Sequence, residues 1–174
     1  MPSNELCPEN CRGYRAAIIT VSDSVYRRER EDASGKVISE ILKTSGFQEK
    51  NYLVLPDEQT LLENEMKKIC DENLADIILT TGGTGFSQRD RTPEATIAIA
   101  ERLVPGIPEA MRLHSMSITK RAMLSRSAAA IRGKTLIVNL PGSPKAAKEN
   151  LQSIIEEIKH GLDILTGKEN ECGT

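Results

Sequence analysis

The apolar and polar positions along the chain predict strands that alternate with amphipathic helices. Runs of apolar residues predict strands, and apolar residues spaced three or four positions apart predict helices that pack on a sheet. The expected strands are 14–21, 51–55, 76–80, 127–131 and 134–139. The expected helices are 35–44, 58–73, 95 to about 103, 109 to about 117 and 146 to about 165.

Local sequence signals mark several ends of these elements. Ser34 is a predicted N-cap for the first helix, and Gly46 ends that helix. Arg132 and Gly133 separate the last two strands, which predicts a hairpin. Cys70 falls at an apolar position of the helix 58–73, so we expect it to pack in the core.

This order of elements predicts a three-layer α/β/α sandwich with a mostly parallel sheet and one antiparallel hairpin strand. We expect a single domain at 14–166, with an N-terminal tail at 1–13 and a C-terminal tail at 167–174. In such sheets, ligands bind beyond the carboxyl ends of the strands. The loops expected there are polar, acidic or glycine-rich: Ser22, Asp23 and Ser24, then 56–58, 81–90 and 141–145.

The most informative segment is the loop that follows the strand 76–80. It begins with Thr81, Gly82, Gly83, Thr84 and Gly85. Glycines allow close approach of the backbone, and free N–H groups in such a turn and at the next helix start favour an anion. Asp90 lies in the same loop between Arg89 and Arg91, which points to phosphate chemistry with a metal.

Simpler interpretations of the same residues stay open. The glycines could form a tight turn without a ligand, and Asp57 could be a turn residue after Pro56. Asp90 could belong to the N-cap region of the next helix. The sequence has no GxxxxGK[ST] motif, which argues against a P-loop nucleotide hydrolase.

Composition and charge narrow the classes of protein. The chain has 174 residues, of which 39% are hydrophobic and 28% charged, and its formal net charge is -2. These values are typical of a soluble globular protein, and no patch predicts nucleic-acid or membrane binding. The first residues lack the features of a signal peptide, so we expect a cytoplasmic protein. Cys7 and Cys11 favour an ordinary tail over a metal site, and a Cys7–Cys172 link stays open.

The motifs of these loops together resemble the molybdopterin adenylyltransferase family, which includes Mog- and MoaB-type proteins and the G domain of gephyrin. The resemblance rests on TGGTG at 81–85 with RDRTPEAT at 89–96, PDE at 56–58, MLSRS at 123–127 and NLPGSP at 139–144. It covers residues 15–165, nearly the whole chain.

The resemblance implies a reaction in which molybdopterin attacks the α-phosphate of ATP, giving adenylylated molybdopterin and pyrophosphate, with Mg²⁺ required. It implies catalytic and metal-binding roles for Asp57 and Asp90. It also implies a homotrimer and a separate insertase protein that receives the product. The implied substrate-binding residues are Ser22, Asp23, Ser24, Thr81, Gly82, Gly83, Thr84, Gly85, Glu94, Ser125, Arg126, Asn139, Pro141, Gly142 and Ser143.

Some of these residues have two interpretations. Ser125 and Arg126 are expected at the terminal phosphate of molybdopterin, because arginine offers a rigid fork of donors. Glu94 either supports the site or is a first-turn acid that the helix dipole favours. Ser34 either contacts ligand or only caps its helix, and Phe86 is the expected ring for adenine stacking. Further candidates with bland alternatives are Asp32, Arg89, Arg91 and Lys145.

The alternative functions are a non-catalytic molybdopterin-binding paralogue and a trimeric scaffold. An inactive paralogue is expected to lose Asp57 or Asp90, and because both are present we favour an enzyme. Residues 105–108 and the helix after them are candidates for subunit contacts. Steady loss of ATP without any pterin would favour a generic hydrolase.

Overall fold

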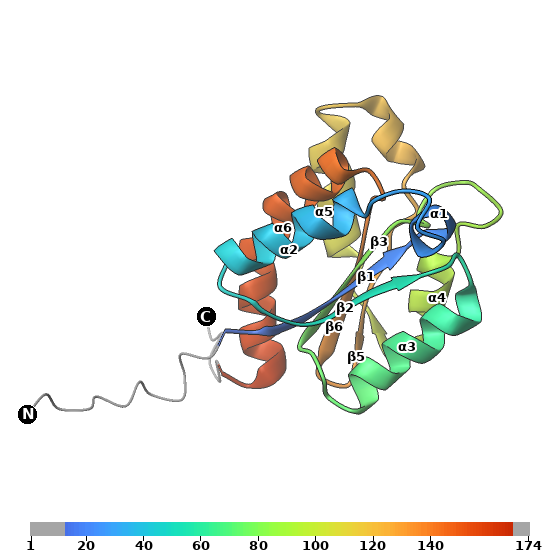
Figure 1. Ribbon diagram of the computed structural model, residues 1–174. Coiled ribbons are helices and arrows are strands. Elements are labelled where there is room, and N and C mark those ends of the chain that lie inside the picture. The colour runs from blue at the N-terminus through green and yellow to red at the C-terminus, as the bar shows by residue number, and fades with distance from the viewer. Residues whose placement is uncertain (1–12, 169–174) are drawn as a thin grey trace, which may run out of the picture.

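A computed structural model describes residues 13–168 (Figure 1), so Cys7, Cys11, Cys172 and most of both expected tails lie outside the described residues. The strands are β1 (Arg15–Val21), β2 (Gln48–Leu55), β3 (Ile77–Thr81), β4 (Arg102–Leu103), β5 (Ala129–Arg132) and β6 (Thr135–Leu140). The helices are α1 (Asp23–Tyr26), α2 (Ala33–Thr44), α3 (Gln59–Asp71), α4 (Thr92–Ile99), α5 (Gly106–Met116), the 3₁₀ helix η2 (Lys120–Leu124) and α6 (Pro144–Thr166).

The six strands form one sheet in the order β2-β1-β3-β6-β5-β4. β1 pairs in parallel with β2 and β3, and β3 pairs in parallel with β6. β5 runs antiparallel to both of its neighbours, β6 and β4. The predicted mostly parallel sheet and its hairpin are therefore confirmed.

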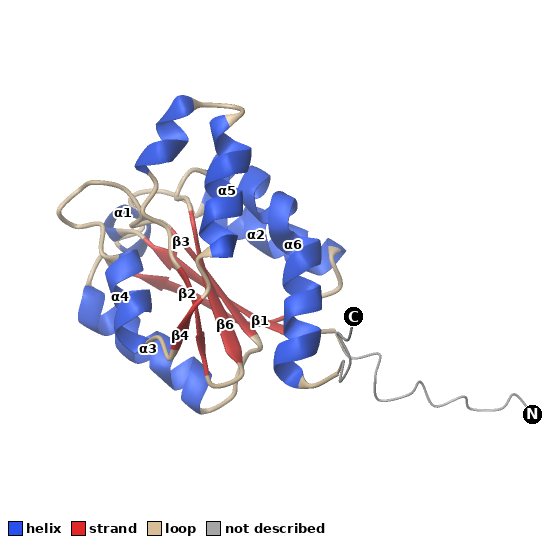
Figure 2. Cartoon of the chain, turned by 180° about the vertical axis from the view of Figure 1, so that it is seen from behind, coloured by secondary structure: helices blue, strands red, loops and turns tan. Residues whose placement is uncertain are grey.

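Helices cover both faces of the sheet, as the two opposite views in Figures 1 and 2 show. Alternate strand residues divide between two cores because successive side chains point to opposite faces. Ile18 and Leu79 pack under α2, α5 and α6. Ile19 and Ile78 pack under α3 and α4, where Cys70 is buried as expected. The predicted three-layer sandwich is therefore confirmed.

The structure corrects the end of one predicted helix. The helix expected to reach about 103 ends at Ile99, and the short strand β4 follows it. The backbone N–H groups of Glu101 and Val104 donate to Ile131 and Ala129. Pairing with the edge of the sheet therefore outweighs the local preference for a longer helix.

Two expectations about the segment between β1 and α2 are also wrong. Asp32 caps α2 in place of Ser34, because the Asp32 carboxylate accepts the N–H of Gly35 at 2.8 Å. The polar loop expected at 22–24 contains the four-residue helix α1, and Ser22 is its N-cap. Such a helix is too short to produce a periodic pattern of apolar residues. No helix among residues 13–168 combines the length and apolarity that a membrane crossing requires.

The order of strands places a switch point between β1 and β3. The connection after β1 leads to β2 on one side, whereas the chain after β3 crosses to the other half of the sheet. In open α/β sheets, the crevice at such a point is the usual place for a ligand. The loops after β1 and β3 are therefore the first place to look for a site.

Candidate active site

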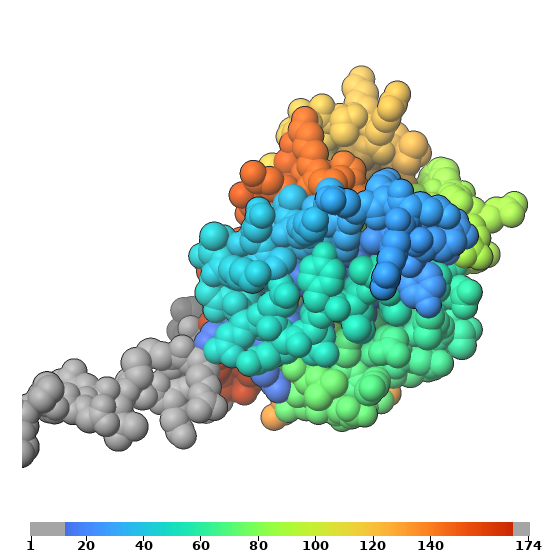
Figure 3. Space-filling model, in the orientation of Figure 1, coloured from blue at the N-terminus to red at the C-terminus, as the bar shows by residue number. Residues whose placement is uncertain are grey.

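A polar cavity of about 430 Å³ lies at this switch point. The ends of β1 and β3, the turn after β2 and the loop after β6 all contribute to its wall. In Figure 3, the segment after β1 (blue) lies against the loop after β3 (yellow-green) on the surface of the protein. Predicted site residues that line this cavity are Ser22, Asp57, Thr81, Gly82, Gly83, Asp90, Gly142 and Ser143.

The glycine loop packs tightly against its neighbours. Gly82 has a φ of +100°, and a Cβ built on it would lie 2.2 Å from the carbonyl oxygen of Val21. Gly83 has a φ of +64°, and a Cβ there would lie 2.3 Å from Oγ1 of Thr92. Only glycine fits both the backbone conformation and the space. The loop is thus pinned between the end of β1 and the start of α4.

Asp57 is joined to Asp23 by two reciprocal hydrogen bonds. The N–H of Asp23 donates to Oδ2 of Asp57 at 2.9 Å, and the N–H of Asp57 donates to Oδ1 of Asp23 at 3.1 Å. The guanidinium of Arg89 donates to both carboxylate oxygens of Asp23, at 2.8 and 2.6 Å. Asp23 therefore connects the turn after β2 to the loop after β3, and it is not among the residues that line the cavity.

The pKa values of Asp57 and Asp23 are shifted in opposite directions. Burial raises the pKa of the Asp57 carboxyl, and the charges of Asp23 and Asp90 add to this rise. The N–H of Asp57 and the guanidinium of Arg89 lower the pKa of the Asp23 carboxyl. Asp57 is thus a carboxylate that gains from an added positive charge, whereas Asp23 already has one.

Asp57 and Asp90 form a donor set that fits a hard divalent cation. Both line the polar cavity, and the charge of Asp90 contributes to the raised pKa of Asp57, so the two carboxylates interact. A cation between them would relieve that repulsion. Among residues 13–168 no three His, Cys, Asp or Glu side chains form a metal-ligating group. Mg²⁺ is suited to one or two carboxylates with substrate phosphates and water as the other ligands.

A second, more apolar cavity of about 310 Å³ lies on the other side of the glycine loop. The predicted residues Thr84, Gly85, Ser125 and Pro141 line it. α5 and η2 supply most of the remaining wall, including Met111, Arg112, Ile118, Arg121 and Leu124. From the sequence, α5 was a candidate for subunit contacts, and no motif indicated that it forms this wall.

Asn139, a predicted site residue, supports the site from outside the two cavities. Asn139 is fully buried, and its Nδ2 donates to Oγ1 of Thr80 and Thr96 at 3.0 and 2.8 Å. Its Oδ1 accepts the N–H of Ala128 at 3.2 Å. All of its bonds are therefore internal, and it joins β3, α4 and β6 beneath the glycine loop.

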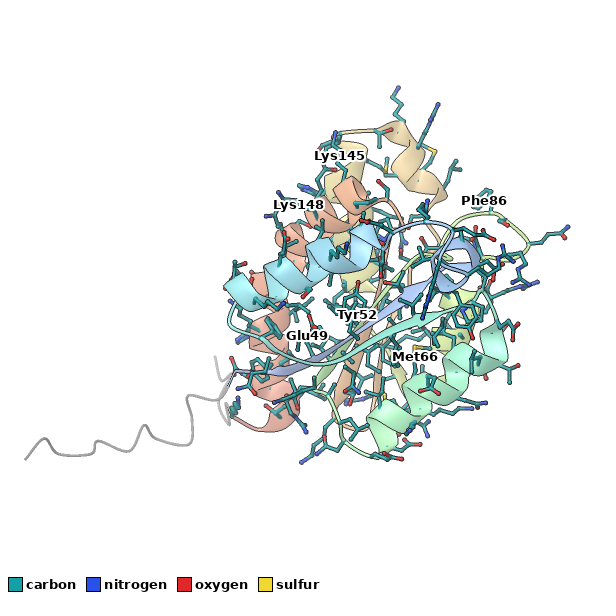
Figure 4. All side chains as sticks on the ribbon, viewed as in Figure 1. Glu49, Tyr52, Met66, Phe86, Lys145 and Lys148 are labelled. Carbon is teal, nitrogen blue, oxygen red and sulfur yellow. The ribbon has the colours of Figure 1, made fainter. Side chains whose placement is uncertain are left out.

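Three further predicted residues, Phe86, Ser24 and Arg126, line neither cavity. Phe86 is 70% exposed, lies on the outside of the loop in Figure 4 and lines neither cavity. Ser24 bonds to Ser22, at 3.2 Å between their hydroxyl oxygens. The guanidinium of Arg126 contacts Glu94, Gly85 and Asp90. Adenine stacking on Phe86 stays a prediction without a contact to support it.

Residues that the sequence analysis did not assign to the site also line the polar cavity. Thr20, the penultimate residue of β1, lies there with its hydroxyl buried. Arg30 also lines it. Ser34, for which the sequence left ligand contact and capping open, lines the cavity as well, and Asp32 is the cap of α2.

The ion pair of Glu94 and Arg126 predicts a pH dependence of stability. Burial pushes the pKa of Glu94 up, but the hydrogen bond and charge of Arg126 outweigh it and leave this pKa below its ordinary 4.5. The carboxylate therefore stabilises the fold above that value, and this contribution is lost as pH falls through the lower folded-state pKa. Urea unfolding at several pH values should show a shallower acid decline for Glu94→Gln than for the parent protein. Glu72 is exposed, so Glu72→Gln is the control and should decline like the parent protein. A decline of Glu94→Gln equal to that of the parent would contradict this assignment.

The fold and the site define an α/β protein with a glycine-loop cradle and a carboxylate pair at the switch point of its sheet. Residues 17–160 match the family described as "Probable molybdopterin binding domain". The chain belongs to this family, as the loop motifs predicted.

Relatives of known name support the same placement. The chain is 40% identical over 152 residues to the molybdopterin adenylyltransferase of Helicobacter pylori strain J99, covering 86% of each chain. It is 38% identical over 155 residues to that of Escherichia coli K12, covering 85% of this chain and 79% of the relative. The crystal structure of the molybdopterin biosynthesis enzyme MoaB from Thermus thermophilus superposes with a TM-score of 0.85. That protein shares 44% identity and is matched over 91% of this chain and 99% of its own.

Proposed function

We propose that this protein is a molybdopterin adenylyltransferase of molybdenum cofactor biosynthesis, which transfers AMP from ATP to molybdopterin and releases pyrophosphate. The observation that carries the proposal is the pair of cavities on either side of one glycine loop. One cavity is polar and holds the two carboxylates, and the other is largely apolar with hydroxyl groups in its wall. A reaction between a nucleotide triphosphate and a pterin needs two such compartments that meet.

The polar cavity is suited to the triphosphate. Gly82, Gly83 and Ser143 line it, and Arg30 adds a positive charge. Asp57 and Asp90 would hold Mg²⁺, whose positive charge offsets the charge of the phosphates. Transfer of a nucleotidyl group depends on alignment and charge neutralisation more than on covalent catalysis. We therefore assign these residues to binding and orienting ATP.

The apolar cavity is suited to the pterin. Met111, Ile118 and Leu124 offer apolar contacts to a flat ring. Ser125 and Arg112 lie in the same wall and would be the donors for a terminal phosphate. Thr84 and Gly85 face this cavity while Gly82 and Gly83 face the other, so the pterin would approach the α-phosphate along the glycine loop.

The proposal includes a homotrimer in the cytoplasm that passes its product to a separate insertase protein. Leu113 on α5 is 75% exposed, and Leu103 on β4 and Met116 on α5 are also exposed. These apolar side chains support the expected subunit contacts at 105–108 and along α5. Sedimentation equilibrium would test this part, because a monomeric mass at micromolar concentration would contradict it.

Incubation of the purified protein with molybdopterin and Mg-ATP tests the function. Adenylylated molybdopterin and pyrophosphate are followed together and should appear in equal amounts. Tight pterin binding without product would favour a carrier or scaffold. Steady loss of ATP without pterin would favour a hydrolase. If the protein neither binds pterin nor forms product, the proposed substrates are wrong.

A further inference from the structure

Arg126 joins three points of the loop that carries Asp90. Its Nε donates to the carbonyl oxygen of Gly85 at 2.6 Å, and its Nη2 donates to the carbonyl oxygen of Asp90 at 2.6 Å. Its Nη1 contacts Oε1 of Glu94 on α4. Its backbone N–H donates to the carbonyl oxygen of Thr84 at 3.0 Å. One residue therefore binds the loop near its beginning, at its end and on the helix that follows.

The loop has few other connections to the body of the protein. Within it, the N–H of Ser87 donates to Oδ2 of Asp90 at 2.9 Å, and the N–H of Asp90 donates to the carbonyl oxygen of Ser87 at 3.0 Å. These bonds hold the tip together without attaching it to the sheet. Outside Arg126, the ion pair of Arg89 with Asp23 attaches the tip, and the Arg89 side chain is more than half exposed. Exposed ion pairs are weak, so Arg126 is the stronger attachment.

The position of Arg126 does not suit direct contact with the substrate. Ser125 and Ser127 on either side of it line the apolar cavity, but Arg126 is not among the residues that line either cavity. Three of its five guanidinium N–H groups, one on each nitrogen, donate to protein oxygens. These three bonds fix the plane of the guanidinium on the loop and on α4.

We propose that Arg126 is a positioning residue, which holds the carboxylate of Asp90 in the polar cavity by fastening the loop 84–90 to the wall of the apolar cavity. The inference rests on the proposed adenylyl transfer and assigns Arg126 a role other than binding the terminal phosphate of molybdopterin. Lysine cannot replace it, because a single ammonium group cannot span three separate acceptors. Ser125 and Ser127 line the apolar cavity, and the guanidinium of Arg126 binds the loop whose Asp90 lines the polar cavity. Arg126 therefore also links the two compartments mechanically.

Amide hydrogen exchange of the ligand-free protein tests the fastening directly. In Arg126→Lys and Arg126→Met, the amides of Ser87 and Asp90 should exchange at least about tenfold faster than in the parent protein, while the amides of β1 and β3 keep their rates. Arg132 supplies the matched control at the opposite end of the sheet. It forks onto the carboxylate of Asp71 at 2.8 and 2.9 Å and donates to the carbonyl of Ile99 at 3.2 Å. Arg132→Lys should leave the loop unchanged.

Kinetics distinguishes positioning from substrate binding. Misplaced catalytic groups lower the rate by up to about 100-fold, so kcat should fall about 10-fold in Arg126→Lys and about 100-fold in Arg126→Met. KM for molybdopterin should stay within about threefold of the parent value in both variants. Glu94→Gln keeps Arg126 but weakens one of its bonds, so its kcat should fall less than that of Arg126→Met. This variant keeps the test available if Arg126→Met does not fold.

Either of two results would overturn the inference. Unchanged exchange at Ser87 and Asp90 would show that Arg126 does not fasten the loop. Faster exchange with a raised KM for molybdopterin and an unchanged kcat would assign Arg126 to the substrate phosphate. The exchange experiment uses no substrate, so its outcome is independent of whether adenylyl transfer is the reaction, and absence of product from the parent protein would count against the function alone.

Discussion

Replacing Asp90 or Asp57 with alanine is expected to reduce the rate of adenylyl transfer by about 100-fold or more, the scale seen when a charge-stabilising group is removed. Both carboxylates line the polar cavity, where burial raises the pKa of Asp57 and the charges of Asp23 and Asp90 add to this rise. A divalent cation and the triphosphate would meet at this point. Without one carboxylate, such a cation would have one ligand fewer and would hold the α-phosphate less firmly.

Activity should be measured with saturating ATP across a series of Mg²⁺ concentrations. We expect the alanine variants to need more Mg²⁺ and to stay slow at saturation. Asp71→Ala is the matched control, because Asp71 binds Arg132 at the far end of the sheet and should leave the rate unchanged. Free energies of unfolding within about 1 kcal/mol of the parent would separate lost chemistry from lost folding. Parent-like rates in either site variant would remove that residue from the catalytic centre.

The glycine loop and the Asp57 turn could be predicted because their signals are local. A buried strand, three glycines and a helix start follow one another within 76–96, and Pro56 precedes Asp57 directly. In a mostly parallel sheet, these loops must meet at one edge, since the strands end there together. The sheet order then brings β1, β3 and β6 side by side, so the lining by Ser22, Gly82 and Gly142 follows from topology.

The roles of Arg126 and Asn139 could not be predicted because their partners are distant in sequence. Arg126 lies 41 positions from Gly85 and 36 from Asp90. Asn139 pairs in register with Thr80 across β3 and β6, and its amide turns inward to Thr96, 43 positions away. A polar residue at the end of a strand looks exposed in a linear pattern. Only the packed sheet shows that both side chains hold the site from beneath or from behind.

The length of α4 shows how tertiary pairing changes a local preference. Its apolar and alanine-rich sequence favours a longer helix, yet the chain leaves the helix at Ile99 to pair with β5. This edge pairing brings the chain to Gly106, where α5 begins. α5 then forms the wall of the apolar cavity. The second compartment of the site therefore depends on a short strand that the sequence pattern did not indicate.

Gly82→Ala is expected to destabilise the fold by about 3 kcal/mol or more and to abolish activity. Gly82 combines a φ of +100° with a carbonyl oxygen of Val21 that would lie 2.2 Å from an added Cβ. A flexible side chain could move aside, but this oxygen belongs to the last residue of β1, an interior strand of the sheet. Relief requires separation of β1 from the loop after β3, which opens the polar cavity at its base.

Gly46→Ala separates the two causes of this effect. Gly46 has a similar φ of +82°, but a Cβ there would meet no atom within 4 Å. It should therefore cost only the strain of a left-handed backbone, about 1 to 2 kcal/mol. Urea unfolding of both variants measures the difference, which reports the contact with Val21 alone. Equal losses in the two variants would mean that the loop moves freely away from β1. The tight cradle that we assign to the triphosphate would then not exist.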